Sequence, residues 1–274
     1  MSQESSYLNL LQGLVIESEH GNLVEDRTGV GTYNLFHRTL RFDLSRSFPL
    51  LTTKKMSLKS ILGELLWFIS GSTNAIELEE KYGCTIWKEW QEQDGQLGKV
   101  YGHQWRNFGG MKKGDIGLGG FDQLKWLINE IKTNPTSRRL YVTAANPNDR
   151  YKQALDCCHN YFQVVIKNGK LNLYFQMRST DVFLGLPYNI ASYALLAHML
   201  ALETGYVVGE LVYSGVDIHL YSNHTEQAKE QLTRTTFELP QIVINKKPFF
   251  KYSLEDFHLL GYESHPVIKA DVAV

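Results

Sequence analysis

Two strand-like runs flank the dipeptide Asn168-Gly169, and this arrangement constrains the fold more than any other local feature of the chain. Residues 161–166 and 171–177 have the composition of β-strands, and Asn-Gly favours the tight turn that joins neighbouring antiparallel strands. A third strand-like run covers residues 139–144. The sequence therefore predicts an antiparallel sheet in the middle of the chain.

Helical signals surround these strands. Apolar residues recur at helical spacing near residues 10–15, 57–69, 121–132, 190–204 and 223–233, and a further strand is expected near 210–214. Ser57 is placed to cap the second helix, and Gly205 to end the fourth. No repeat, linker or low-complexity tract divides the chain, so we expect one catalytic domain over residues 1–274. The predicted fold class is α+β, with helices covering one face of a mixed, largely antiparallel sheet.

The charge balance excludes some classes of partner. Lys and Arg number 28 against 29 Asp and Glu, a net charge of −1, so no global basic field could hold a nucleic-acid backbone. We expect no requirement for DNA. The first residues show no basic and apolar leader, and the apolar stretch 190–202 is interrupted by His198, which indicates a buried helix rather than a membrane span. A cytoplasmic location is expected.

Three cysteines, Cys84, Cys157 and Cys158, cannot all pair, and adjacent cysteines rarely bridge. No metal-ligand spacing is present, so at least one thiol is free to act as a nucleophile, although free cysteines are often inert core residues. His159 follows Cys158 in a predicted strand and should point to the opposite face, so it is not positioned as a simple base. Arg178, on the paired strand, is the candidate cation beside a Cys158 thiolate.

Other polar residues stand where they could bind or react. Glu64 lies inside the predicted helix 57–69, so its carboxylate should be partly buried with a raised pKa, or else paired with an arginine. Asn189, before the helix 190–204, could cap that helix or offer its amide to the N3–H and O4 of uracil. Arginines at strand and turn edges could bind a phosphate, and one strand face could bind a sugar hydroxyl. These residues are Arg27, Arg138, Arg139 and Arg178, with Ser179, and Asp217, His219 and Tyr221 on the strand face.

Taken together, ordered tracts along nearly the whole chain resemble the thymidylate synthase family. The matching tracts are Asp26-Arg27-Thr28-Gly29, Thr52-Thr53-Lys54, Glu64-Leu65-Leu66-Trp67-Phe68, Thr85-Ile86-Trp87, Val100-Tyr101-Gly102, Ser137-Arg138-Arg139, Cys158-His159, Arg178-Ser179, Asp181-Val182-Phe183-Leu184-Gly185, Pro187-Tyr188-Asn189-Ile190-Ala191-Ser192-Tyr193, His219-Leu220-Tyr221 and Ala273-Val274. The resemblance implies a homodimer with that family's fold.

The resemblance also implies a reaction. Cys158 would add to C6 of dUMP, and C5 would then capture the methylene of the co-substrate 5,10-methylenetetrahydrofolate, giving dTMP and dihydrofolate. Glu64 would organise water and proton transfer, and Tyr101 would assist removal of the C5 proton. The implied catalytic group comprises Cys158, Glu64, Tyr101, His159, Arg178 and Asn189. No metal is implied.

Substrate recognition follows from the same resemblance. Arg27, Arg178 and Ser179 would hold the phosphate of dUMP, with Arg138 and Arg139 reaching in from the second subunit, while Asn189 would bind the uracil edge and His219 and Tyr221 the ribose. The folate would contact Trp87, Asp181, Gly185 and Val274, with Lys54 near its glutamyl tail.

Three departures from the family pattern lie close to the expected nucleophile. Cys157, preceded by Asp156, replaces a usual Pro, Met177 replaces a usual Gln, and Ala145 replaces a usual Trp. The Met-Arg-Ser tract also resembles phage pyrimidine-nucleotide hydroxymethylases, in which water rather than hydride quenches the methylene. The alternative is therefore a dUMP 5-hydroxymethylase that releases 5-hydroxymethyl-dUMP and tetrahydrofolate. A non-catalytic nucleotide-binding paralogue is the second alternative, against which the retained catalytic residues argue.

Overall fold

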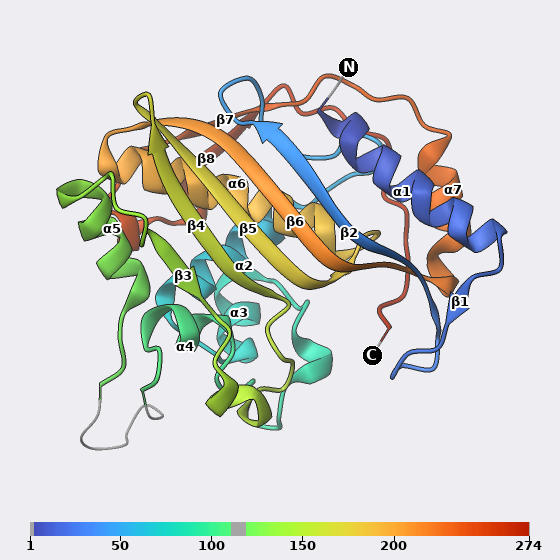
Figure 1. Cartoon of the computed structure of the whole chain (residues 1–274), viewed down its shortest axis with the longest axis horizontal. Coiled ribbons are helices and arrows are strands. Elements are labelled where there is room, and N and C mark those ends of the chain that lie inside the picture. Colours follow the sequence, from blue (N-terminus) through green and yellow to red (C-terminus); the bar gives the residue numbers. More distant parts are fainter. Residues whose placement is uncertain (1–2, 111–118, 274) are drawn as a thin grey trace.

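A six-stranded sheet forms the centre of the computed structural model, which describes residues 3–110 and 119–273 (Figure 1). The strand order is β1-β2-β6-β5-β4-β3. The strands are β1 (Leu23–Val24), β2 (Thr32–Asp43), β3 (Tyr141–Thr143), β4 (His159–Lys167), β5 (Lys170–Asp181) and β6 (Val207–Tyr221). Neighbouring strands are antiparallel except for the parallel pair β5 and β6. The prediction of a mixed, largely antiparallel sheet is confirmed.

The hairpin of β4 and β5 forms at the predicted turn. Lys167 pairs with Lys170, and the two residues between them, Asn168 and Gly169, both have positive φ angles of 53° and 71°. Asn and Gly adopt this left-handed conformation more readily than other residues, so the dipeptide fixes both the turn and the strand register. That register sets His159, beside the expected nucleophile, opposite Met177 and next to Arg178.

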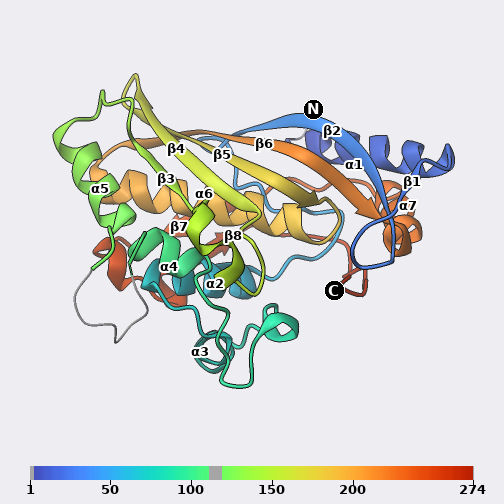
Figure 2. The same cartoon turned by 60° about the horizontal axis from the view of Figure 1, so that its bottom comes forward.

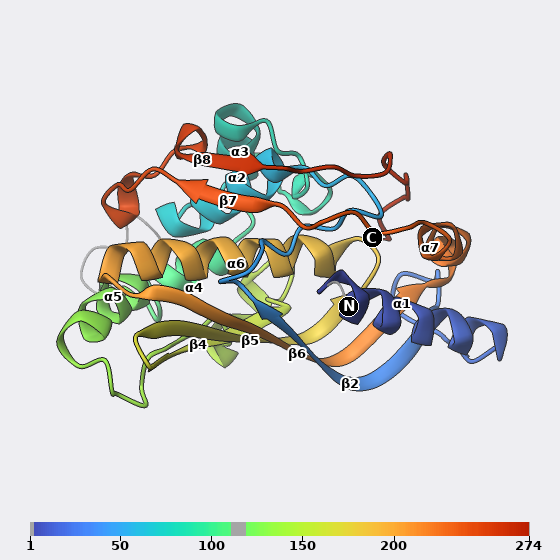
Figure 3. The ribbon, with the colours of Figure 1, turned by 90° about the horizontal axis from the view of Figure 1, so that it is seen from above.

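Helix α6 (Gly185–Thr204) connects β5 to β6 and makes their parallel pairing possible. The helix ends at Gly205, whose φ of 80° is the left-handed conformation expected of a glycine that terminates a helix. Figure 3 shows α6 between the large sheet and a second layer that holds α2 and the two-stranded ribbon of β7 (Gln241–Ile244) and β8 (Phe257–Leu260). Because α6 is covered on both sides, thirteen of its twenty residues are buried and none is exposed.

Helix α2 (Leu58–Ser70) lies on the same side of the sheet as α6, with α3 (Ala75–Tyr82) beyond it (Figure 2). The Ser57 side chain accepts a hydrogen bond from the Ser60 N–H, which confirms the predicted cap. The remaining helices are α1 (Glu4–Glu19), α4 (Tyr101–Arg106), α5 (Gln123–Thr133) and α7 (Thr225–Leu232). One core of buried side chains draws members from Tyr7 to Ile268.

Two predicted element limits were wrong in ways that affect the site. Helix α6 (Gly185–Thr204) begins at Gly185 rather than at residue 190, so Asn189 is its fifth residue, which excludes the N-cap role that the sequence had left open. The strand expected near 210–214 continues to Tyr221, so the row Asp217, His219 and Tyr221 belongs to β6 itself. Strand β3 is shorter than the run that predicted it.

No helix among the described residues is long and apolar enough to cross a membrane.

Candidate active site

Thirteen of the catalytic and binding residues that the family resemblance implied meet in one cavity of about 420 Å³. The cavity lies where the end of β5, the end of β6 and the start of β4 meet the first turns of α6 and the buried helix α2. The predicted residues that line it are Arg27, Glu64, Trp87, Tyr101, Cys158, His159, Arg178, Ser179, Asp181, Gly185, Asn189, His219 and Tyr221. Segments from most of the chain therefore contribute to a single site.

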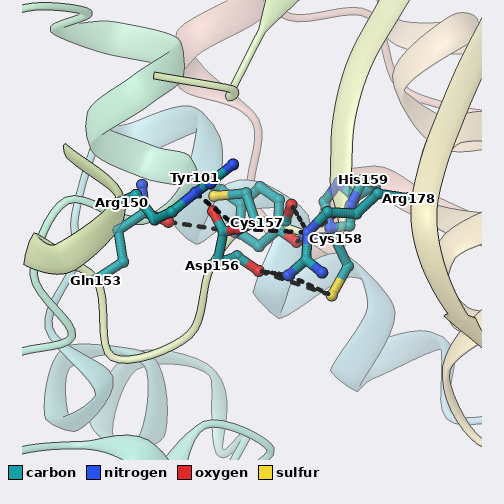
Figure 4. Close-up of polar contacts among 8 residues, drawn as sticks. All are labelled: Tyr101, Arg150, Gln153, Asp156, Cys157, Cys158, His159 and Arg178. Atoms are coloured by element: carbon teal, nitrogen blue, oxygen red, sulfur yellow. Dashed lines mark hydrogen bonds and ion pairs between the residues drawn. The ribbon is translucent and has the colours of Figure 1, made fainter. Parts of the chain in front are cut away.

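Cys158 lies beside Arg178, as the strand pairing predicted. The Cys158 Sγ is 3.7 Å from Nη2 of Arg178, and the guanidinium also donates to the backbone oxygens of Asp156 (2.6 Å) and Cys157 (3.1 Å) (Figure 4). Burial raises the pKa of the Cys158 thiol, whereas the positive charges of Arg178 and Arg27 lower it. Burial is the larger effect, so the pKa of the thiol is raised overall, and the two arginines are the groups that favour the thiolate against it.

His159 points away from the thiol and is held neutral. Its Nδ1 is 2.9 Å from the hydroxyl of Tyr193, and its ring stacks on Tyr101 with centroids 3.9 Å apart. Burial lowers the pKa of His159 to about 3. An imidazole with that pKa does not accept a proton near neutral pH, which agrees with the expectation that His159 is no simple base for Cys158.

Tyr101, from α4, anchors the backbone of the nucleophile. Its hydroxyl accepts hydrogen bonds from the N–H groups of Cys158 (2.7 Å) and His159 (3.4 Å). Burial raises the pKa of Tyr101, so the phenol stays protonated and keeps its own O–H available to donate into the cavity. Tyr101 therefore joins backbone positioning to a hydroxyl near the reacting thiol.

Glu64 faces the cavity from helix α2 and is buried. Its Oε1 accepts a hydrogen bond from the Trp87 indole N–H at 2.8 Å, so among the described residues the carboxyl pairs with an indole rather than with an arginine. Desolvation raises the pKa of Glu64 to about 7, although the Trp87 hydrogen bond opposes this shift. A carboxyl group with this pKa can both give and take a proton near neutral pH.

Polar side chains of β6 line one edge of the cavity, where they could bind the hydroxyl groups of a sugar. His219 Nδ1 lies 3.5 Å from the Asp217 carboxylate, which also accepts from the Asn34 side chain at 3.0 Å. Tyr221 shares the strand face with both residues and lines the cavity, as the alternation of strand side chains predicted. Asp181 Oδ1 accepts hydrogen bonds from the backbone N–H groups of Phe183 and Leu184, which directly precede α6.

Three predicted residues that the structure describes do not line this cavity. Lys54 is buried, with its Nζ 3.7 Å from the ring centroid of Phe183 and hydrogen-bonded to the Phe183 carbonyl, and burial lowers its pKa to about 7. Arg138 and Arg139 are exposed before β3, away from the cavity of their own chain. Val274 lies outside the described residues, although Val272 and Ala273 line the cavity.

Sequence reasoning missed several apolar lining residues. Trp90, Ile86 and Leu155 line the cavity beside Trp87, and Trp90 packs edge-on against that indole at 6.0 Å. The cluster of tryptophans near residue 90 was the available signal, but isolated aromatic residues do not reveal which face is open. Among the departures, Met177 is buried and lines the cavity, and Cys157 is buried behind it.

A cavity that holds an arginine-paired thiol and a protonatable carboxyl is the arrangement typical of enzymes that use a cysteine for covalent catalysis. The family model described as thymidylate synthase matches residues 5–274. The chain therefore belongs to the thymidylate synthase family. Membership in this family assigns one-carbon transfer with a folate co-substrate.

Proposed function

We propose that this chain converts dUMP and 5,10-methylenetetrahydrofolate into dTMP and dihydrofolate. The observation that carries the proposal is the position of Cys158 Sγ, 3.7 Å from Arg178 Nη2, in the same cavity as Glu64 and Asn189. A thiolate, a cation that stabilises it and a group that exchanges protons are the three parts that attack on a pyrimidine ring requires.

Cys158 forms the bond to C6 of the pyrimidine. Addition of the thiolate moves the electron pair of the C5–C6 double bond onto C5 and O4, so C5 becomes the nucleophile that attacks the methylene carbon. Loss of the C5 proton and of the folate amine gives an exocyclic methylene, which hydride from the folate reduces as the Cys158–C6 bond breaks. Arg178 stabilises the sulfur as a thiolate before attack and after release.

Glu64 and Tyr101 handle protons in this scheme. Because its pKa is about 7, Glu64 can supply a proton, through water, to the oxygen at C4 when charge develops there and can take it back later. Tyr101 places its hydroxyl beside Cys158, where the proton of the adjacent C5 leaves. Trp87, which donates to Glu64, keeps the carboxyl oriented and forms an apolar wall for the folate ring.

Polar groups around the cavity match the nucleotide. Arg27, Arg178 and Ser179 supply charge-assisted hydrogen bonds to the phosphate, each contributing about 1.5–3 kcal/mol. The Asn189 amide offers one donor and one acceptor to the uracil edge, and His219 with Tyr221 binds the ribose hydroxyl. The folate contacts Asp181, Gly185 and the chain end with Val274. Lys54, which is buried, lies near the glutamyl tail of the folate.

A homodimer completes the proposed site. Arg138 and Arg139 are exposed and lie outside their own cavity, so they are available to a second copy of the chain. The sheet face away from α6 carries a row of tyrosines, with Tyr141 stacked on Tyr161 at 5.6 Å and Tyr161 against Tyr174 at 6.3 Å. This open face (Figure 1) gives the second copy an apolar surface on which to pack.

Hydroxymethylation of dUMP is the second candidate, and Met177 is the observation that favours it. Met177 lines the cavity, and its thioether cannot make the hydrogen bonds of the Gln that is usual in the family. A looser polar network at the nucleotide would let water reach the exocyclic methylene. Water would then form 5-hydroxymethyl-dUMP and leave tetrahydrofolate unoxidised.

One assay separates these reactions. The protein is incubated with dUMP and 5,10-methylenetetrahydrofolate, and both products are identified by chromatography and mass spectrometry. We expect dTMP and dihydrofolate in equal amounts. Tetrahydrofolate with 5-hydroxymethyl-dUMP would establish the second candidate, and bound dUMP without either product would mean that the chain is a nucleotide-binding paralogue.

A further inference from the structure

A bridge of two arginines and one carboxylate lies behind the nucleophile. The Asp156 Oδ2 is 3.5 Å from Arg178 Nε and 3.7 Å from Arg150 Nε. Arg150 comes from the 3₁₀-helix Pro147–Lys152, whereas Asp156 immediately precedes the pair Cys157 and Cys158. Figure 4 shows the Arg178 guanidinium between Asp156 and the Cys158 sulfur. One carboxylate is therefore shared by two cations, of which only Arg178 lines the large cavity.

Asp156 acts from the far side of Arg178. A second, smaller cavity of about 50 Å³ is lined by Asp156 and Arg150, neither of which lines the large cavity. Arg178 lines both cavities and so forms the wall between them. Asp156 cannot touch a nucleotide in the large cavity directly, but it shares the guanidinium that would hold the phosphate and the thiolate.

The charges that face Cys158 come from several elements. On Cys158 itself, Arg178 and Arg27 lower the thiol pKa and Asp156 raises it, in addition to the effect of burial. The other titratable groups around the thiol and its arginine are Cys157, Tyr101, Tyr221 and Asp217. Asp156 is the carboxylate that opposes formation of the Cys158 thiolate, and Arg150 is a second cation at nearly the same distance from that carboxylate as Arg178.

We propose that Asp156 is a positioning residue that, balanced by Arg150, sets how much of the positive charge of Arg178 is available to the Cys158 sulfur and to an incoming phosphate. When Asp156 engages Arg178 fully, the thiol is less reactive and the phosphate site is weaker. When Arg150 holds the carboxylate, Arg178 is free for both tasks. The inference rests on the proposed role of Cys158 as nucleophile, and it adds a control of that residue which lies outside the substrate cavity.

The first test is the substitution Asp156→Asn, which keeps the shape and removes the charge. The reactivity of Cys158 is measured without substrate, as the pH midpoint of iodoacetamide alkylation at Cys158, located by tandem mass spectrometry to separate it from Cys157. We expect the midpoint to fall by about 0.5–1 pH unit, because a negative charge a few ångströms from the guanidinium has been removed. The dissociation constant for dUMP should fall in the same variant.

Arg150→Gln gives the opposite expectation. Without Arg150 the Asp156 carboxylate engages Arg178 alone, so the alkylation midpoint should rise and dUMP should bind more weakly. The double variant Asp156→Asn with Arg150→Gln should match Asp156→Asn alone, since no carboxylate remains to be shared. Glu226→Gln is the matched control, because Glu226 pairs with Lys229 on α7 at 2.9 Å and is 82% exposed. Its midpoint should equal that of the parent protein.

The outcomes distinguish this inference from the proposed function. An unchanged midpoint in both single variants, in a protein that still makes dTMP, overturns the role of Asp156 and leaves the function intact. Midpoints that move in opposite directions, in a protein that makes no product, support Asp156 and overturn the function. Equal and same-direction shifts in both variants would show a merely structural effect and also overturn the inference.

Discussion

At the scale of single residues, the burial of Glu64 raises the pKa of its carboxyl group into the range where it can transfer protons. Its pKa of about 7 lies above the value of 4.5 for a free glutamate because the carboxyl is desolvated. Between these two values the folded protein keeps the proton and the unfolded chain loses it. The folded state therefore loses stability as pH rises through this window.

The variant Glu64→Gln should remove that pH dependence while keeping an acceptor for Trp87. We expect its free energy of unfolding, relative to the parent protein, to improve by up to about 3 kcal/mol between pH 4.5 and pH 8. Urea unfolding at both pH values measures the difference. Parallel changes in the two proteins would show that Glu64 ionises normally. Turnover should fall by at least about a hundredfold at either pH, since the amide exchanges no proton.

Cys158→Ser separates the nucleophile from the binding site. A serine hydroxyl is a far weaker nucleophile than a thiolate beside Arg178, so turnover should fall by at least about a thousandfold. The phosphate and uracil contacts do not involve the sulfur, and dUMP binding measured by calorimetry should remain. Cys84→Ser, at a buried cysteine outside the cavity, is the matched control and should retain turnover. Full activity in the Cys158 variant would remove the central proposal.

Asn189→Asp should change which base is accepted. In the proposed function the Asn189 amide presents a donor and an acceptor to uracil, whereas a carboxylate presents acceptors that suit the amino group of cytosine. We expect the ratio of kcat/KM for dUMP over dCMP to fall by about tenfold or more. Steady-state kinetics with each nucleotide gives the ratio. An unchanged preference would mean that the base is recognised by other residues.

At the scale of elements, Gly205 fixes where α6 stops and β6 begins. Its φ of 80° is costly for a residue with a Cβ atom, by about 1–2 kcal/mol. Gly205→Ala should lower the free energy of unfolding by about 1 kcal/mol, and Gly205→Asn by less, because Asn tolerates this conformation. Chemical denaturation compares the two variants. Equal losses would show that the left-handed backbone is not the cause.

Local sequence signals predicted which helices and strands form better than they predicted the residues at which those elements begin and end. Asn168-Gly169 and Ser57 specified a turn and a cap because each acts within a few residues. Asn189 was ambiguous, since an Asn near a helix start can cap it or lie within it, and only the packing of α6 decided. Strand β6 ran further than expected because its pairing with β2 continues to Tyr221, which no local pattern reveals.

The site was predictable to the extent that it follows from strand pairing. Arg178 could be placed beside Cys158 because the hairpin turn fixes the register of β4 and β5. The hydrogen bond from Trp87 to Glu64 joins two segments 23 residues apart, and the bridge of Asp156 to Arg150 joins a loop to a 3₁₀-helix. These contacts depend on tertiary packing, and spacing along the chain does not encode them.

At the scale of the whole molecule, one face of the sheet has no covering layer among residues 3–110 and 119–273. Helix α6 packs on the opposite face (Figure 1). The rings of Tyr141, Tyr161 and Tyr174 form a row on the open face. Phe36 on β2 is 82% exposed. A sheet with an aromatic face of this kind is usually buried against another surface, and a second copy with a twofold axis would bring exposed arginines of each chain toward its partner.

Mixing two inactive variants tests whether the site is shared. Cys158→Ser lacks the nucleophile, and the double variant Arg138→Ala with Arg139→Ala lacks the proposed contribution to the partner. In a mixed dimer, one site combines an intact Cys158 with intact arginines from the other chain. Random exchange at equal amounts makes half of the dimers mixed with one competent site each, so activity should recover to about one quarter of the parent level.

The recovery should appear only after subunits exchange, so it should follow brief treatment with mild denaturant and its removal. Each variant treated alone is the control and should remain inactive. If Arg138 and Arg139 served their own chain, every mixed dimer would carry two defective sites and no activity would return. The quarter-level recovery therefore requires both that the chain dimerises and that these two arginines cross the interface, which neither sedimentation nor single-variant kinetics can establish together.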